Sequence, residues 1–228
     1  MIAHLKLLKR ALDIKWVALH YNNFTFQKIF WRGELSRYDW DKKEIYGNEW
    51  GDPDNANHRF GNYVAVKNRL ISLARPESTI LEIGSYSGKW VQYLLSAREI
   101  ICADIDDLGF LYIRQKFPQE HIRFYLTKGN ELKGIKDDSV DLVFSMDTFV
   151  RVSKKHILDY LKESYRVLKN QGRIFFHLPC VEKVMCHDRA FTDLSLKEIN
   201  KMVHSLPFKD ISIDHNTLNH GVIVEAVK

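Results

Sequence analysis

Residues 79–90, with the sequence TILEIGSYSGKW, leave this chain few ways to fold. The first five residues are apolar or β-branched apart from Glu82, which predicts a short buried strand. Gly84 and Gly88 follow, and residues 90–95 then place apolar side chains at helical spacing. A strand, a glycine turn and a helix in this order predict an α/β domain with a nucleotide-type pocket at the carboxyl end of the strand.

The residues around that turn predict the charge of the ligand. Gly84 allows a tight turn, and Gly88 lets a ligand approach the backbone. The amino terminus of the predicted helix favours a negative group such as a carboxylate. Glu82 would repel a pyrophosphate, but it suits an ammonium group. The implied ligand is therefore zwitterionic, and S-adenosylmethionine fits this description. A glycine turn in some other α/β protein is the alternative.

The pattern Glu82-x-Gly84-x-x-x-Gly88 resembles motif I of the class I S-adenosylmethionine-dependent methyltransferases. The resemblance implies a Rossmann-like α/β domain with a mostly parallel sheet of seven strands. Helices would cover both faces of this sheet, and the last strand would be antiparallel. The resemblance also implies that Ser85, inside the motif, contacts the cofactor.

A second buried strand, residues 99–104, ends in Asp104, which lies 20 residues beyond Gly84. This spacing puts a carboxylate at the tip of the neighbouring strand, where it can accept hydrogen bonds from both ribose hydroxyls. We therefore expect Asp104 and the adjacent Ile105 to bind the cofactor. Asp107 is expected to start the helix that follows. Asp106 lies between them, and a helix-cap role for all three acids is the alternative.

Residues 121–126 and 138–147 read as the third and fourth strands. The third strand leads into a glycine followed by Asn130 and Glu131, where the resembling family usually has Gly-Asp with the acid facing the adenine amino group. The side-chain carbonyl of Asn130 can still accept that hydrogen bond, and Glu131 is assigned to the cofactor with it. An ordinary turn is the alternative. Ser145, near the end of the fourth strand, is expected to face the pocket.

Residues 139–179 look like the matching stretch of small-molecule methyltransferases, with Arg-Val-Leu-Lys-x-x-Gly between two strands. The stretch also resembles a bacterial subgroup of glycan-associated methyltransferases. In that subgroup the fourth strand ends in Phe-Ser-Phe-Asp, a Val-His follows, and the fifth strand ends in His. Asp147 and His177 match this pattern, whereas Arg151 replaces the His of the Val-His pair.

The resemblance implies methyl transfer from a sulfonium to an oxygen or nitrogen, a step that depends mainly on in-line geometry. A hydroxyl acceptor must also lose its proton. Asp147 and His177, at the tips of adjacent strands, are the predicted catalytic residues. A neutral His177 would accept the proton while Asp147 orients the imidazole or the acceptor. Arg151 is expected to bind substrate. The alternative is that Asp147 and His177 only orient a loop.

Residues 1–54 are predicted to form a helical, aromatic cap in front of a methyltransferase domain at residues 55–228. Residues 1–20 read as a helix that packs on the domain or on a second subunit, although its Lys and Arg side chains also allow weak association with a membrane surface. Tyr46 and Trp50, in a segment rich in aromatic and turn-forming residues, are expected to stack on a substrate. Filling a small core of the cap is the alternative.

Three further segments complete the predicted fold. Residues 57–74 read as a helix before the first strand. A helix is expected to begin at about Ser195. Residues 208–215 and 222–227 read as an antiparallel hairpin that ends the domain.

The composition suits one domain with an added cap. The 228 residues are 45% hydrophobic, enough for a single core, and no apolar run approaches membrane-spanning length. The net charge of +5 is small and spread along the chain, so it is only weak evidence for nucleic acid, and we do not expect nucleic acid as a partner. Cys102, Cys180 and Cys186 form no disulfide framework, so a cytoplasmic location is expected.

No metal is predicted from the sequence. The candidate zinc ligands lack a recognised order and spacing; they are His177, Cys180, Cys186, His187 and Asp188. A divalent-metal site of the catechol type around Asp147 is the alternative.

The predicted function is S-adenosylmethionine-dependent methylation, most simply O-methylation, of a small molecule or a glycan precursor. An RNA methyltransferase and a non-catalytic cofactor-binding module are the alternatives. Against the first, the chain has no Asn-Pro-Pro-Tyr-type motif after the fourth strand; against the second, the residues of the cofactor motif are intact.

Overall fold

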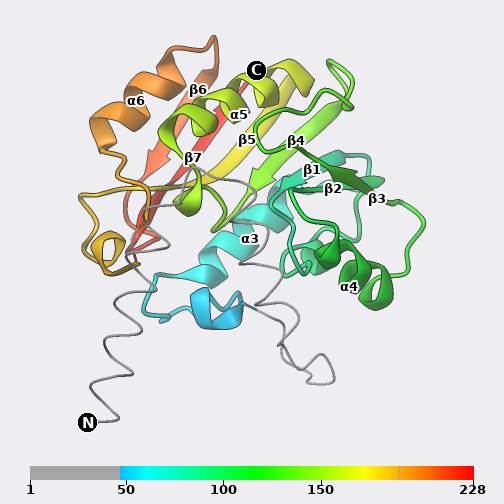
Figure 1. The fold of residues 1–228 in the computed structure, drawn as a ribbon, viewed down its shortest axis with the longest axis horizontal. Helices are drawn as coiled ribbons and strands as arrows, with labels where there is room; N and C mark the ends of the chain where they lie inside the picture. The colour runs from blue at the N-terminus through cyan, green and yellow to red at the C-terminus, as the bar shows by residue number, and fades with distance from the viewer. Residues whose placement is uncertain (1–46, 190) are drawn as a thin grey trace.

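The computed structural model describes residues 47–189 and 191–228, and a seven-stranded sheet lies at its centre (Figure 1). The strands are β1 (Thr79–Ile83), β2 (Glu99–Asp104), β3 (Ile122–Leu126), β4 (Val140–Ser145), β5 (Leu168–Pro179), β6 (Lys209–Asp214) and β7 (Gly221–Val227). Their order in the sheet is β3-β2-β1-β4-β5-β7-β6. Neighbouring strands from β3 to β5 pair in parallel, whereas β7 is antiparallel to both β5 and β6. The expected Rossmann-like α/β fold, with its antiparallel last strand, is confirmed.

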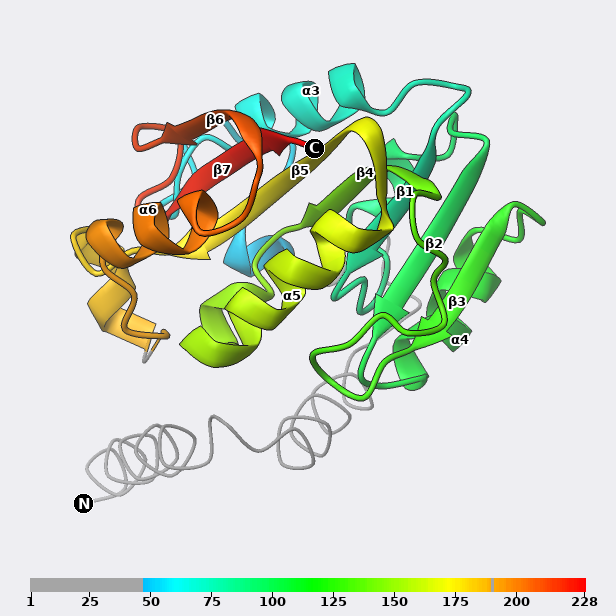
Figure 2. The ribbon, with the colours of Figure 1, turned by 90° about the horizontal axis from the view of Figure 1, so that it is seen from above.

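Helices cover both faces of this sheet. The longer ones are α3 (Tyr63–Leu73), α4 (Leu108–Lys116), α5 (Lys154–Val167) and α6 (Leu196–His204). Seen from above, α3 lies on one side of the sheet, and α5 and α6 lie on the other (Figure 2). Side chains of α4 belong to the same core as those of α3, and side chains of α5 and α6 share the second core. The sheet is therefore the middle of three layers, each interface with its own apolar core.

The strand order places a pocket between β1 and β4. From β1 the chain moves outward in one direction through β2 and β3, and then returns to continue from β4 through β5 in the other direction. Ligands of open α/β sheets bind at such a switch point, outside the carboxyl ends of the strands. All five residues of β1 are buried because both of its neighbours and both helical layers cover it.

The helix expected at residues 90–95 is absent, and this prediction is wrong. A single short 3-10 helix, Val91–Tyr93, occupies the position, and β2 begins only six residues later at Glu99. The apolar side chains that suggested an α-helix are Trp90, Val91 and Leu94. They are buried, and they pack a single short turn against the sheet. No α-helix amino terminus therefore follows the glycine turn to receive a carboxylate.

Two other helix starts differ from the prediction. Helix α3 begins at Tyr63 rather than near residue 57, because the Asn62 side chain caps it by accepting a hydrogen bond from the Ala65 N–H at 3.0 Å. Asp107 makes no side-chain capping bond to α4; instead, Asp106 Oδ1 accepts from the Leu108 N–H at 2.7 Å. Helix α6 does begin after a Ser195 cap, and the terminal hairpin forms, as expected.

No helix within the described residues is both long and apolar enough to cross a membrane. The predicted helix at residues 1–20, including its contact with a membrane or a second subunit, lies outside the described residues.

Phe144 of β4 offers a test of the core beneath the site. Its ring stacks on Phe175 at 5.7 Å and meets Trp90 edge-on at 5.6 Å, and the side chain is fully buried. We expect Phe144→Ala to lower the free energy of unfolding by about 3–5 kcal/mol, because a cavity would remain. Urea denaturation measures the change. The matched control is Leu111→Ala on the exposed face of α4, where the effect should stay within about 0.5 kcal/mol. Equal effects of the two substitutions would contradict this account of the core.

Candidate active site

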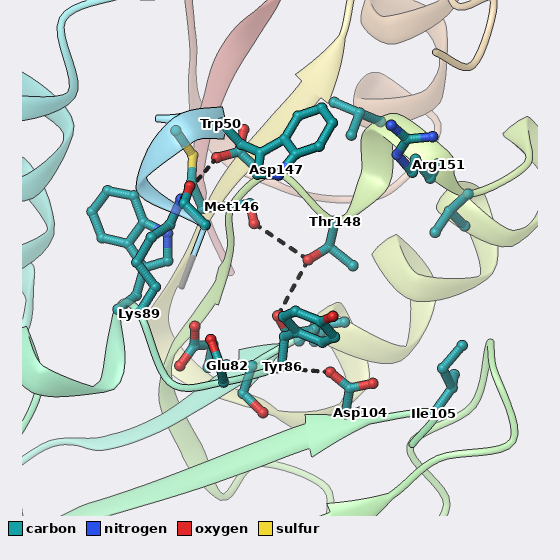
Figure 3. A pocket seen from close by; sticks show the side chains of 18 of the residues that line it. Trp50, Glu82, Tyr86, Lys89, Asp104, Ile105, Met146, Asp147, Thr148 and Arg151 are labelled. Carbon is teal, nitrogen blue, oxygen red and sulfur yellow. Dashed lines mark hydrogen bonds and ion pairs between the residues drawn. The ribbon is translucent and has the colours of Figure 1, made fainter. Parts of the chain in front are cut away.

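One pocket extends along the carboxyl ends of β1, β2 and β4 (Figure 3). Glu82 and Asp104 lie toward one end of it, and Trp50, Asp147 and Arg151 toward the other. The predicted cofactor residues that line the pocket are Glu82, Gly84, Ser85, Asp104 and Ile105. The pocket therefore joins the predicted cofactor residues of β1 and β2 to the predicted catalytic carboxylate after β4.

The turn after β1 requires glycine at one position. Gly84 has a φ of +78°, and a Cβ there would lie 2.1 Å from Thr148 Oγ1. The Gly84 N–H donates to the Ala103 carbonyl at 2.7 Å, which ties the turn to β2. A side chain at this position would both strain the backbone and push Thr148, on the β4 side, out of the pocket wall.

Asp104 lies at the tip of β2 and is held by backbone donors. Its Oδ2 accepts from the Tyr86 N–H at 2.8 Å, drawn as a dashed line in Figure 3, and its Oδ1 accepts from the Asp106 N–H at 3.2 Å. Burial raises the pKa of Asp104 to about 6, although these backbone hydrogen bonds oppose the rise. Each carboxylate oxygen keeps a second lone pair for a hydroxyl donor.

Glu82 is a buried carboxyl with one oxygen that no described group satisfies. Its side chain is 2% exposed, and its Oε2 has no hydrogen-bond partner among the described residues. Burial, and then repulsion from Asp104, raise the pKa of Glu82 to about 8, while Lys89 opposes the rise. A buried acceptor without a donor fits the ammonium group of the zwitterionic ligand predicted from the sequence.

Several residues assigned to the cofactor do not line the pocket. Ser145 is fully buried, and its Oγ donates to the Ile83 carbonyl at 3.0 Å. Gly88 has a φ of +83°, and a Cβ there would lie 2.8 Å from the Ile113 side chain, so α4 rather than a ligand approaches it. The sequence pattern located the turn correctly, but it assigned Gly88 to the ligand, whereas Gly88 packs against helix α4.

Asn130 and Glu131 also point elsewhere. The Asn130 side-chain amide donates to Asp159 Oδ2 at 3.0 Å, and Glu131 pairs with Lys133 at 2.6 Å. The pocket wall at this position is formed by Gly129 and Thr127 instead. The expected contact of Asn130 with an adenine amino group is therefore not supported by its placement.

Four side chains contact Asp147 at the other end of the pocket. The Tyr63 hydroxyl lies 3.1 Å from its Oδ1 and 3.2 Å from its Oδ2, and Lys89 Nζ lies 3.6 Å from Oδ2. His177 Nδ1 and His220 Nε2 each lie 3.1 Å from Oδ1. Burial alone would raise the pKa of Asp147, but these histidines and Lys89 hold it well below its usual range.

His177 lies behind Asp147 and not on the pocket wall. Its side chain is fully buried, and burial lowers its pKa to about 4. The expected direct contact between His177 and an acceptor does not fit this placement. His220 lines the pocket in its place, with its ring centroid 4.3 Å from that of His177.

The sequence did not point to His220 because it falls in the turn before β7. Pairing of β7 with β5 sets Gly221 opposite Pro179, which brings the turn beside the end of β5. Gly221 also permits close approach to His177, since a Cβ there would lie 2.3 Å from His177 Nε2. The signal that could have placed His220 in the site is the register in which β7 pairs with β5.

Aromatic side chains surround Arg151 at the acceptor end. Its guanidinium lies 5.7 Å from the ring centroid of Trp50 and 5.6 Å from that of Phe191. All three residues line the pocket. The other predicted substrate residue, Tyr46, lies outside the described residues, as do the side chains of His187 and Asp188.

The segment that carries Trp50 is fastened to the site by polar contacts. Lys89 Nζ donates to the carbonyls of Gly47 and Gly51 at 3.1 Å each, and the Tyr63 hydroxyl lies 3.0 Å from the Trp50 carbonyl. Lys89 and Tyr63 are the same two side chains that contact Asp147. This wall of the pocket is therefore linked directly to the central carboxylate.

Comparisons with known proteins agree with this geometry. Residues 81–176 match the family model described as a methyltransferase domain. Comparison with curated protein sequences found no match. Among solved structures, a SAM-dependent methyltransferase from Archaeoglobus fulgidus is 15% identical, with a TM-score of 0.60 over 72% of this chain and 94% of that one.

Two more solved structures share the fold. An S-adenosylmethionine-dependent methyltransferase from Mesorhizobium loti is 12% identical, with a TM-score of 0.62 over 73% of this chain and 97% of that one. A SAM-dependent methyltransferase from Aquifex aeolicus is 16% identical, with a TM-score of 0.59 over 84% of this chain and 99% of that one. The family match over residues 81–176 and the sheet order thus show a methyltransferase domain with the fold of S-adenosylmethionine-dependent methyltransferases, which implies S-adenosylmethionine as the cofactor.

Proposed function

We propose that the protein transfers the methyl group of S-adenosylmethionine to a hydroxyl of a small molecule or glycan precursor, with Asp147 contacting that hydroxyl. The observation that carries this proposal is the position of Asp147, a carboxylate on the wall of the same pocket as Glu82 and Asp104. A carboxylate accepts a hydrogen bond from a hydroxyl, and so it can orient one for attack.

The cofactor end of the pocket would hold S-adenosylmethionine by its polar groups. Glu82 would receive the ammonium group, which supplies the donors that Oε2 lacks. Asp104 would receive the ribose hydroxyls on its remaining lone pairs. Gly129 and Thr127, on the wall beyond β3, would border the adenine. With the donor held in this way, its methyl group would point toward Asp147.

The transfer itself needs little from the protein beyond alignment. A lone pair of the acceptor oxygen forms the new C–O bond as the C–S bond breaks, and the sulfonium becomes the neutral thioether of S-adenosylhomocysteine. The hydroxyl proton passes to Asp147 and from there to solvent. Because the Lys89 ammonium, 3.6 Å from Oδ2, favours the ionised carboxylate, Asp147 would relay this proton and not retain it. His177, behind Asp147, would act as a positioning residue.

The acceptor end suits a compact, partly apolar substrate. Trp50 and Phe191 offer ring faces on which a sugar or other ring can stack, and Arg151 between them offers hydrogen-bond donors. Because Gly47 and Trp50 line the pocket, residues 1–54 would act as a cap that closes over the acceptor, ahead of the catalytic domain at residues 55–228.

Asp104 should contribute to cofactor affinity through its hydrogen bonds with the ribose hydroxyls. We expect Asp104→Ala to weaken S-adenosylmethionine binding by about 1.5–3 kcal/mol, the usual range for hydrogen bonds to a charged group. Calorimetry measures the change. Glu131→Gln is the matched control, because Glu131 was assigned to the cofactor from sequence but pairs with Lys133 instead. Unchanged affinity in a folded Asp104 variant would contradict the assignment.

Binding of the cofactor should be linked to the ionisation of Glu82. With a pKa of about 8 in the ligand-free protein, Glu82 is mostly protonated at neutral pH. An ammonium group favours the carboxylate, so binding should release close to one proton, and affinity should rise about tenfold per pH unit between about pH 6.5 and 7.5. Calorimetry in buffers of different ionisation enthalpy measures the release. Glu82→Gln should abolish it, whereas Glu131→Gln should retain it. Binding without proton release in the intact protein would refute the pairing.

Asp147 tests the proposed reaction. Isotope transfer from labelled S-adenosylmethionine into hydroxylated metabolites or a glycan extract identifies acceptors and supports O-methylation if the label enters an ether. With such an acceptor, we expect Asp147→Asn to lower kcat by about 10²–10⁴ while cofactor affinity barely changes. The control is Asp137→Asn, an exposed carboxylate outside the pocket. A near-normal rate in the Asp147 variant would show that the carboxylate does not take part, and label found only on nitrogen or in RNA would replace the proposed acceptor class.

A further inference from the structure

Among residues 47–189 and 191–228, one group of three His, Cys, Asp or Glu side chains is close enough to hold a metal ion: Asp147, His177 and His220. Both histidines direct one ring nitrogen at the same atom, Asp147 Oδ1, at 3.1 Å. The strands β4 and β5 and the turn before β7 each supply one member. Three polar atoms from separate parts of the chain therefore converge on one point.

The hydrogen bond on the far side of His220 fixes where its proton lies. His220 Nδ1 is 3.1 Å from the Phe60 carbonyl, and a carbonyl can only accept. Nδ1 therefore carries the proton, and the Nε2 of a neutral His220 turns a lone pair toward Asp147 Oδ1. Two electron pairs that face each other at 3.1 Å repel unless a cation lies between them.

The ring nitrogen of His177 that faces Asp147 also carries no proton in the neutral side chain. The Asp147 backbone N–H donates to His177 Nδ1 at 3.3 Å, so this nitrogen also presents a lone pair. Asp147 Oδ1 lies 3.1 Å from the same nitrogen, and a metal ion bound there would take this lone pair in place of the long hydrogen bond. The proton of a neutral His177 then belongs on Nε2, which has no partner among the described residues. This ring orientation leaves the Nε2–H of His177 without a described partner and places Nδ1 beside the Asp147 carboxylate.

The nearby donors do not relieve this convergence. The Tyr63 hydroxyl has one proton, and it lies 3.0 Å from the Trp50 carbonyl, 3.1 Å from Asp147 Oδ1 and 3.5 Å from His220 Nε2. Lys89 approaches the opposite carboxylate oxygen, Oδ2, at 3.6 Å. A single added proton would bridge only two of the three converging atoms, whereas a metal ion can bond to all three.

The geometry points to a divalent transition-metal site formed by Asp147 Oδ1, His177 Nδ1 and His220 Nε2. Metal–ligand bonds of about 2.1 Å and an oxygen–nitrogen separation of 3.1 Å correspond to an angle of about 95° at the metal, close to that between neighbouring octahedral ligands. Two imidazoles and one carboxylate suit a first-row ion such as Fe²⁺, Co²⁺ or Zn²⁺ better than Mg²⁺. The Phe60 carbonyl would orient His220 as outer-shell acceptors usually do.

This inference rests on the proposed function for its role in catalysis, but not for its existence. Asp147 and His220 line the pocket, so the free coordination positions of a bound ion would face the acceptor. A metal ion lowers the pKa of a bound hydroxyl. The acceptor would then lose its proton to solvent, with Asp147 acting as a ligand in place of the base. The acceptor oxygen would form the new C–O bond as the C–S bond breaks, and S-adenosylhomocysteine would be the leaving group.

The test measures binding of Co²⁺ without substrate or turnover. The full chain is stripped with a chelator, titrated with Co²⁺, and followed by calorimetry and by the visible absorption of bound cobalt. We expect one Co²⁺ per chain in the intact protein and in the control His204→Ala, a histidine on the exposed end of α6. Loss of one ligand in Asp147→Asn or His220→Ala should weaken binding at least about 100-fold, since even outer-shell partners contribute 10–100-fold.

The outcomes separate this inference from the proposed function. Affinity that is the same in the intact protein and the ligand variants, or no cobalt bound at all, would overturn the metal site and leave the isotope-transfer result unaffected. Conversely, stoichiometric Co²⁺ binding in a protein that methylates no hydroxyl would retain the site and reject the function. Since S-adenosylmethionine binding reports the fold of each variant, a misfolded His220→Ala would be replaced by His220→Gln, which keeps the volume and removes the imidazole.

Discussion

The carboxylate of Asp147 is the contact on which the acceptor end of the pocket depends. It draws together side chains from α3, from the turn after β1, from the end of β5 and from the turn before β7. Its own backbone has a φ of +58°, a strained value for a residue with a side chain. A buried negative charge is costly unless it is surrounded by donors or cations, and so these segments are held in place around it.

The cofactor end is organised by a different constraint, the burial of β1. Because β1 lies between β2 and β4, its carboxyl end opens at the point where the strand order reverses. The glycine turn, the buried Glu82 and the tip of β2 follow from that position. Cofactor recognition thus comes from the sheet itself, whereas the acceptor end is assembled from loops and from the segment that carries Trp50. Such a division lets one fold keep its cofactor while its acceptor varies.

The parts of this structure that sequence could predict are those set by local pattern. The bounds of β1 and β2 coincide with the predicted strands, because a parallel strand buried on both faces is a short continuous apolar run. The same pattern placed Glu82, Gly84 and Asp104 at the pocket, because Glu82 and Asp104 lie in these strands and Gly84 directly follows β1. The helix after the glycine turn was wrong because burial of Trp90 and Leu94 in a short connection outweighed the helical spacing.

The acceptor end was less predictable because its contacts are distant in sequence. Asp147 and His220 are 73 residues apart, and only the pairing of β7 with β5 brings them together. Asn130 was assigned to adenine from its place in the chain, but its side-chain NH2 group donates to Asp159 on α5, and Asn130 does not line the pocket. Hydrogen bonds between distant elements carry no local signature, so a motif can name a position without fixing where its side chain points.

The positions of Glu82 and Asp104 also bear on what happens after the methyl group has left. An ammonium group and a ribose are common to S-adenosylmethionine and S-adenosylhomocysteine, so in the proposed binding mode these two carboxylates would hold the spent donor by the same hydrogen bonds as the fresh one. The two molecules differ only in the methyl group and in the positive charge that it confers on sulfur, and neither the ammonium group nor the ribose is changed by the transfer. We therefore expect the demethylated donor to remain bound and to inhibit, so that exchange of the cofactor, rather than alkylation, limits steady-state turnover.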